Sequence, residues 1–128
     1  MSSSLLAVVV DCRDPRAQAG FWAAVLDRRM AERNTDEYLV DDPRRSGSPL
    51  YFMKVPEGKQ VKNRLHLDLV TPGSMQEEVA RLVEAGASVL DVRQDPPTFE
   101  NPDTWTVMLD PEGNEFCVFN ADTVTGMP

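Results

Sequence analysis

Short apolar stretches separated by polar turns run along the chain in two successive sets. In the first set, Leu5 to Val10 is an apolar, β-branched run of strand length. A helix is predicted over residues 15–26, because Asp14 can cap its first turn, Pro15 suits the first helical position and apolar residues follow at helical spacing. Three more strands are expected in this set, over Arg29–Arg33, Glu37–Val40 and Leu50–Val55.

The second set repeats this order. Residues Arg64 to Leu69 alternate polar and apolar, the pattern of a strand whose two faces differ. Ser74 and Glu77 form a capping-box pair at the start of a helix, and Gly86 stands where that helix is expected to end. Three strands complete the set, over Ser88–Val92, Thr104–Leu109 and Glu115–Phe119. A proline-rich loop from Gln94 to Pro102 separates the first two of these strands.

The two sets align without a gap over their first strand and helix, which places Leu6 opposite Leu65 and Ala7 opposite His66. This internal repeat predicts an α+β fold of two βαβββ modules. Module one spans about 5–58 and module two about 63–120, within a single domain of residues 1–128. Neither module holds enough core to stand alone, so we expect the two to pack together around a shared cleft.

Composition excludes several classes of protein. The 128 residues include 13 basic and 21 acidic side chains, for a net charge of −8, so we expect no nucleic-acid partner. A single histidine excludes any site built from several histidines of one chain. The longest apolar run has six residues, Leu5 to Val10, and no basic segment precedes it. We therefore expect no membrane partner and a cytoplasmic protein, in which Cys12 and Cys117 are thiols.

The charge is unevenly distributed. Residues 1–64 hold 11 basic and 9 acidic side chains, whereas residues 65–128 hold 2 and 12. One interpretation is two differently solvated faces. The other is a homodimer in which the more positive half of one copy meets the negative half of its partner.

Several motifs carry a family resemblance. They are Asp14-Pro15 with Phe21-Trp22, residues 62–69, Ala85-Gly86-Ala87, and residues 105–118 with the turn Asp110-Pro111-Glu112-Gly113-Asn114. Over about residues 5–120 the chain resembles the glyoxalase/bleomycin-resistance/dioxygenase group, the vicinal oxygen chelate superfamily, in its glyoxalase-like branch. The resemblance implies curved mixed sheets around a cleft. Many members are homodimers that bind one divalent metal and act as isomerases, lyases or dioxygenases, whereas others bind no metal and sequester antibiotics.

The resemblance also implies where metal ligands would lie, on the first and last strand of each module. In module one these positions are Ala7, which cannot bind a metal, and a residue near Met53. In module two they are His66 and Cys117, so the family's ligand set is incomplete. Imidazole, thiolate and carboxylate all bind zinc. The candidate ligands are therefore His66, Cys117 and Glu115, with Asp68 as an alternative to Glu115; the cofactor is one divalent ion (zinc, iron or manganese) or none.

The wider candidate site follows from strand alternation, which puts polar residues of the 64–69 strand on the side facing the cleft. The candidate ligand-binding residues are Trp22, Phe52, Met53, Arg64, His66, Asp68, Trp105 and Cys117. His66 is also the candidate general base, because a histidine exchanges protons near neutral pH. The alternatives are core packing for Trp22 and Cys117, a polar wall position for His66 and a solvated surface for Arg64.

Two functions of different class follow. In the first, the chain binds a small aromatic or oxygenated molecule in its cleft, like the bleomycin-resistance proteins, with a degenerate metal site. In the second, it is a lyase, isomerase or dioxygenase that uses His66 as metal ligand or general base. A third hypothesis is a dimerising structural or regulatory module.

Overall fold

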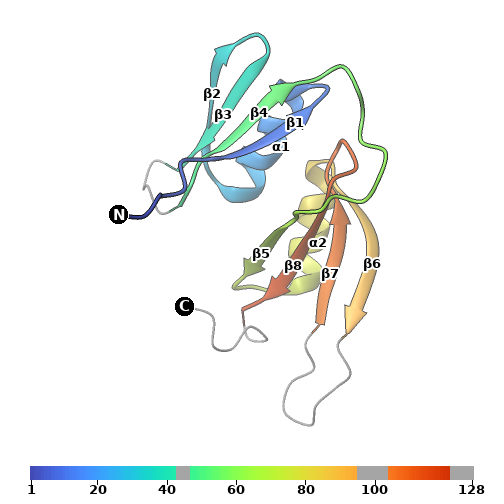
Figure 1. The fold of residues 1–128 in the computed structure, drawn as a ribbon. Helices are drawn as coiled ribbons and strands as arrows, with labels where there is room; N and C mark the ends of the chain where they lie inside the picture. Colours follow the sequence, from blue (N-terminus) through green and yellow to red (C-terminus); the bar gives the residue numbers. More distant parts are fainter. Residues whose placement is uncertain (43–46, 95–103, 122–128) are drawn as a thin grey trace. The chain divides into compact units, whose positions relative to one another are not determined.

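The computed structural model describes residues 1–42, 47–94 and 104–121, and Figure 1 shows the fold. The chain divides into two compact units, Met1–Gln60 and Val61–Pro128. Each unit contains a strand, a helix and three further strands, in that order, and its four strands form one sheet. The α+β class and the two βαβββ modules expected from the sequence are confirmed.

The elements of the first unit are β1 (Val8–Cys12), α1 (Pro15–Leu26), β2 (Arg29–Asn34), β3 (Glu37–Asp41) and β4 (Leu50–Lys54). Its sheet has the order β1-β4-β3-β2. The β1–β4 pair is parallel and the other two pairs are antiparallel. The first and last strands of the module are therefore direct neighbours.

The elements of the second unit are β5 (Leu67–Thr71), α2 (Met75–Ala85), β6 (Ser88–Gln94), β7 (Thr104–Leu109) and β8 (Glu115–Asn120). Its sheet has the equivalent order, β5-β8-β7-β6, with a parallel β5–β8 pair and antiparallel β8–β7 and β7–β6 pairs. In the sequence repeat, the first and last residues of β1 align with the first and last residues of β5. The structure therefore reproduces the alignment of the two modules.

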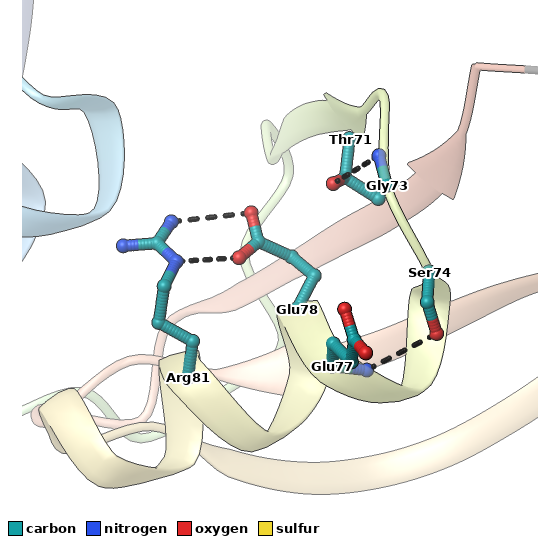
Figure 2. A network of polar contacts seen from close by, with 6 residues as sticks. All are labelled: Thr71, Gly73, Ser74, Glu77, Glu78 and Arg81. Atoms are coloured by element: carbon teal, nitrogen blue, oxygen red, sulfur yellow. Dashed lines mark hydrogen bonds and ion pairs between the residues drawn. The ribbon is translucent and has the colours of Figure 1, made fainter.

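Both helices begin at the caps that the sequence predicts. Asp14 Oδ1 accepts a hydrogen bond from the backbone N–H of Ala17 at 3.1 Å, ahead of Pro15 in the first turn of α1. Ser74 Oγ accepts from the N–H of Glu77 at 3.3 Å at the start of α2, as Figure 2 shows. Gly86 follows α2 with a φ of +126°, a conformation that glycine adopts without strain.

Each helix packs on one face of its own sheet. In the first unit, α1 buries Ala19, Phe21 and Trp22 and contacts β3 and β4, where Phe52 is fully buried. In the second unit, the fully buried residues are Leu82 of α2 with Met108, Phe116 and Val118 of the sheet. Each such large apolar side chain stabilises the fold by roughly 1.5–3 kcal/mol. Because side chains alternate along a strand, the intervening residues point to the other face of each sheet.

Some strand bounds and residue environments differ from the prediction. β1 begins at Val8 rather than Leu5, and β5 at Leu67 rather than Arg64. The reason is pairing: β1 pairs with β4 from Val8 onward, and β5 pairs with β8 from Leu67 onward. Leu65 lies ahead of this pairing and is 85% exposed. Gln18 of α1 is fully buried although it is polar. The proline-rich loop lies outside the described residues from position 95 onward.

Candidate metal-binding site

His66, Asp68 and Cys117 come together in the second unit. Asp68 lies on β5 directly beside Cys117 on β8, because the parallel register pairs these two residues. His66 stands immediately before β5, two residues from Asp68. One ligand atom of each residue, a ring nitrogen, a carboxylate oxygen and the thiol sulfur, lies within 4.8 Å of the other two. Within the described ranges, no other group of three or more such residues is this close.

The histidine and the aspartate also contact each other. Nδ1 of His66 lies 2.9 Å from Oδ1 of Asp68, and the two side chains are 40% and 46% exposed. When Nδ1 carries the ring proton, it donates to Asp68 and leaves the lone pair of Nε2 for a metal ion or a proton. Cys117 is only 7% exposed, so the cluster joins one buried sulfur to two accessible polar groups.

The cluster lies on the sheet face that points away from α2, which we call the distal face. Phe116 and Val118, the neighbours of Cys117 on β8, pair in register with Met108 and Thr106 of β7, and all four are buried with Leu82 of α2 in the core of the second unit. The alternation of the strand therefore places Cys117 on the distal face. The residues of the distal face include Asp68, Val70, Trp105, Val107, Leu109, Glu115, Cys117 and Phe119.

An aromatic pair occupies the same face. Trp105 of β7 and Phe119 of β8 are register partners, and their rings stack at a centroid distance of 5.8 Å and an interplanar angle of 18°. Phe119 lies two residues beyond Cys117 on β8, which is about 6.6 Å along a strand. The distal face therefore combines metal-type donors with an aromatic surface one strand repeat away.

The donor set fits a tetrahedral ion of the zinc type. Zinc accepts imidazole, carboxylate and thiolate at about 2.0–2.3 Å, which places the ligand atoms about 3.5 Å apart in a tetrahedral site. The widest separation in the cluster, 4.8 Å, exceeds this by roughly one ångström. Rotation of the half-exposed His66 and Asp68 side chains can close that difference, whereas the buried Cys117 is fixed by its strand.

Glu115 has a different environment from that expected of a metal ligand. Its carboxylate is 7% exposed and accepts hydrogen bonds from the backbone N–H of Asn63, at 3.4 Å to Oε1 and 3.2 Å to Oε2. It is not part of the close donor group, in which Asp68 takes the third place. The contact with Asn63, rather than the distance along β8, separates the Glu115 carboxylate from the donor group.

The first unit has no equivalent donors at the matching positions. Its register pairs Val9 with Tyr51, and the alignment of the two modules makes these the counterparts of Asp68 and Cys117. Tyr51, rather than Met53, therefore stands in the last-strand position, with the Arg33 guanidinium 6.0 Å from its ring centre. Ala7 corresponds to His66. The three donor residues of the second unit are therefore matched by alanine, valine and tyrosine in the first unit.

The other residues predicted to contact a ligand differ in their burial. Trp22 and Phe52 are 3% and 0% exposed in the core of the first unit, where the Trp22 ring packs edge-on against Phe21. We therefore assign these two residues to packing rather than to ligand contact, because side chains buried between helix and sheet offer no surface. Met53 is half-buried on β4, and Arg64 is exposed before β5. Asn63 is not among the predicted site residues, because an asparagine between Lys62 and Arg64 has no distinguishing pattern in the sequence.

Comparison with known proteins identifies the family of the chain. A family model described as "Glyoxalase-like domain" matches residues 7–119. The chain belongs to the glyoxalase-like domain family. No curated protein matches this glyoxalase-like chain by sequence. Among its described residues, neither helix has the length and apolar character needed to cross a bilayer.

Solved structures agree on the fold. A glyoxalase/bleomycin resistance protein/dioxygenase family enzyme from Burkholderia phytofirmans PsJN has a TM-score of 0.66 at 23% identity, covering 92% of this chain and 98% of that one. A glyoxalase-related enzyme from Fulvimarina pelagi has a TM-score of 0.69 at 15% identity, with 94% and 90% covered. A mutant of the fosfomycin resistance protein FosX from Listeria monocytogenes has a TM-score of 0.71 at 14% identity, with 93% and 90% covered. That mutant was solved with Mn(II) and 1S,2S-dihydroxypropylphosphonic acid.

Proposed function

We propose that this glyoxalase-like chain binds a small aromatic or oxygenated molecule on the distal face of the second sheet, beside one divalent metal ion held by His66, Asp68 and Cys117. The observation that carries the proposal is the approach of three donor atoms to within 4.8 Å. Three protein ligands leave one tetrahedral position for an oxygen of the small molecule. The thiolate favours zinc or iron over manganese, which prefers oxygen ligands.

Different residues would bind the metal ion and the small molecule. The buried Cys117 fixes one ligand position, and Asp68 offers a carboxylate that binds the ion in place of its contact with His66 Nδ1. The Trp105–Phe119 pair provides an apolar surface for a planar group of the small molecule. When bound, the ion polarises the ligand oxygen as a Lewis acid.

This proposal revises the degenerate metal site expected from the sequence. The family resemblance implies ligands in both modules, and Ala7 removes one of them. Asp68 compensates, because its place in the register of β5 and β8 is directly beside Cys117. The proposed site is therefore complete within the second unit.

A second candidate function is proton transfer without metal, as in a lyase or isomerase. It is supported by the 2.9 Å contact between His66 Nδ1 and Asp68, since a carboxylate that holds Nδ1–H presents Nε2 as a general base. In this candidate, Nε2 takes a proton from the substrate and returns it at a neighbouring atom. The two candidates compete, because a metal ion on the same nitrogen removes the base.

Elemental analysis of the purified chain, prepared without chelator, separates the two. The metal proposal expects about one equivalent of zinc or iron in the wild type and less than a tenth of that in His66→Ala. Asp91→Asn, at an exposed site on β6, is the matched control and should keep its metal. A metal-free wild type that takes up no zinc, iron or manganese contradicts the metal site and leaves His66 as base.

Binding of the small molecule has a separate test. Melting temperatures are measured with aromatic and oxygenated compounds, with and without added zinc. We expect compounds that contain both groups to stabilise the wild type only with zinc, and to lose this effect in Trp105→Ala. Stabilisation by none of them contradicts ligand binding and favours the dimerising module.

Two further parts of the proposal concern the state of the protein. Cys12 and Cys117 are thiols in different units, which supports a cytoplasmic location. The charge difference between the two halves supports a homodimer.

A further inference from the structure

His66 is not held in place by strand pairing. β5 begins at the next residue, and residues 61–66 form neither helix nor strand. The side chain of His66 is 40% exposed, so packing fixes it only in part. A metal ligand must nevertheless be held near its working geometry. The contact between His66 Nδ1 and Asp68 orients the ring, but the backbone of residues 61–66 needs an anchor of its own.

Asn63 ties this segment to the rest of the second unit. Its backbone N–H donates to both carboxylate oxygens of Glu115, at 3.4 and 3.2 Å, and its Nδ2 donates to Oδ1 of Asn114 at 2.9 Å. These bonds reach across 52 and 51 residues of sequence to the start of β8. His66 follows three residues later, a span of at most about 10 Å of chain.

The turn before β8 orients the asparagine that faces Asn63. The carboxylate of Asp110, itself 4% exposed, accepts the Nδ2 group of Asn114 at 3.2 and 3.0 Å and its backbone N–H at 2.9 Å. With Nδ2 turned toward Asp110, the amide oxygen of Asn114 points to the opposite side, where it meets Asn63. The turn and β8 thus present two acceptors to the segment that carries His66.

We propose that Glu115 is a positioning residue for the His66–Asp68–Cys117 cluster, acting through the backbone of Asn63, and is not a metal ligand. The inference rests on the proposed function, because it concerns the same metal site. Glu115 lies two residues from Cys117 on one face of β8, so a single strand fixes the sulfur ligand and anchors the segment of the nitrogen ligand. Mutation of residues that hold a metal ligand in place, without binding the metal themselves, typically lowers metal affinity by about 10- to 100-fold.

Cobalt(II) titration of the full chain tests the role of Glu115. The charge-transfer band reports the cobalt–thiolate bond, and the visible ligand-field bands report the number and type of ligands. We expect Glu115→Ala to weaken cobalt binding by about 10- to 100-fold, with an unchanged spectrum at saturation. Glu115→Gln keeps a carbonyl oxygen for the N–H of Asn63 and should recover most of the affinity. Glu84→Gln, at an exposed site on α2, is the control and should match the wild type.

Two outcomes overturn the inference. If Glu115 is a ligand, Glu115→Gln and Glu115→Ala lose affinity alike and both change the ligand-field bands. If Glu115 has no role, Glu115→Ala binds cobalt as the wild type does. Should Glu115→Ala fail to fold, Glu115→Asp replaces it: the carboxylate, one methylene shorter, withdraws from the N–H of Asn63, and we expect a loss of several-fold with an unchanged spectrum, whereas no loss contradicts the proposal.

Failure of the metal proposal is distinguishable from failure of this one. His66 is the only histidine, so a chain labelled with ¹⁵N-histidine gives signals from a single imidazole ring. If the wild type binds no cobalt, the metal site is refuted. The ring signals then test by themselves whether Glu115 positions His66. Ring signals that shift or broaden in Glu115→Ala but not in Glu115→Gln support positioning, and ring signals unchanged in both refute it.

Discussion

Asp110 accepts several hydrogen bonds within the turn before β8, and its replacement by asparagine gives a quantitative prediction. Its Oδ1 accepts the backbone N–H groups of Glu112 and Asn114, both at 2.9 Å. Nδ2 of Asn114 donates to the two carboxylate oxygens at 3.2 and 3.0 Å. Asp110→Asn keeps one acceptor oxygen for the backbone but turns an NH₂ group toward the Nδ2 of Asn114, where two donors then face each other.

The magnitude follows from these bonds. A hydrogen bond to a charged group contributes about 1.5–3 kcal/mol and a neutral one about 0.5–1.5 kcal/mol, so removing the charge and opposing two donors should cost about 2 kcal/mol. Urea unfolding followed by circular dichroism measures this loss. With a typical slope near 2 kcal/mol per molar urea, the midpoint should fall by about 1 M.

Asp14→Asn is the matched control. Asp14 caps α1 with an exposed bond to the N–H of Ala17, and asparagine is as good a cap as aspartate, so its free energy of unfolding should change by less than about 0.5 kcal/mol. The reasoning fails if Asp110→Asn unfolds at the same urea concentration as the wild type. It also fails if both variants lose the same stability, because the loss would then not depend on the bonds within the turn.

Three other predictions concern the site, the core and assembly. Asp68→Ala should weaken zinc binding by at least tenfold in a competition titration. Asp68→Asn should weaken it less, because an amide oxygen can still bind the ion. Equal zinc affinity in the wild type and both variants contradicts Asp68 as the third ligand. Phe116→Ala should lower the free energy of unfolding by about 3–5 kcal/mol, because the side chain is fully buried. Sedimentation at low salt should show a dimer that dissociates as salt is added, and a monomer at micromolar concentration would refute the charge argument.

The fold could be predicted well because local signals agree. The caps at Asp14 and Ser74, the glycine after α2 and the gapless internal repeat all point to the same order of elements. Strand bounds were less predictable, since they depend on which residues pair with the neighbouring strand. Nothing in the alternation of residues 64–69 reveals that β8 offers no pairing before Leu67.

The candidate site could be predicted only in part, for the same reason. His66 and Cys117 stand out by residue type and by family position, and the structure brings their ligand atoms together. The choice between Asp68 and Glu115 depends on the register of β5 against β8, which sequence spacing does not contain. The register of β5 and β8 places Asp68 beside the sulfur of Cys117. The carboxylate of Glu115 instead accepts a hydrogen bond from the backbone N–H of Asn63. The burial of Trp22 likewise depends on which side of α1 meets the sheet.

X-ray absorption at the zinc edge tests the central claim most directly. The purified full chain, loaded with one equivalent of zinc, should show one sulfur neighbour at about 2.3 Å and its remaining neighbours as nitrogen or oxygen at about 2.0–2.1 Å. The sulfur neighbour should disappear in Cys117→Ser and persist in Cys12→Ser. Zinc surrounded only by nitrogen and oxygen in the wild type, or a sulfur neighbour that survives in Cys117→Ser, would contradict a metal site formed by His66, Asp68 and Cys117.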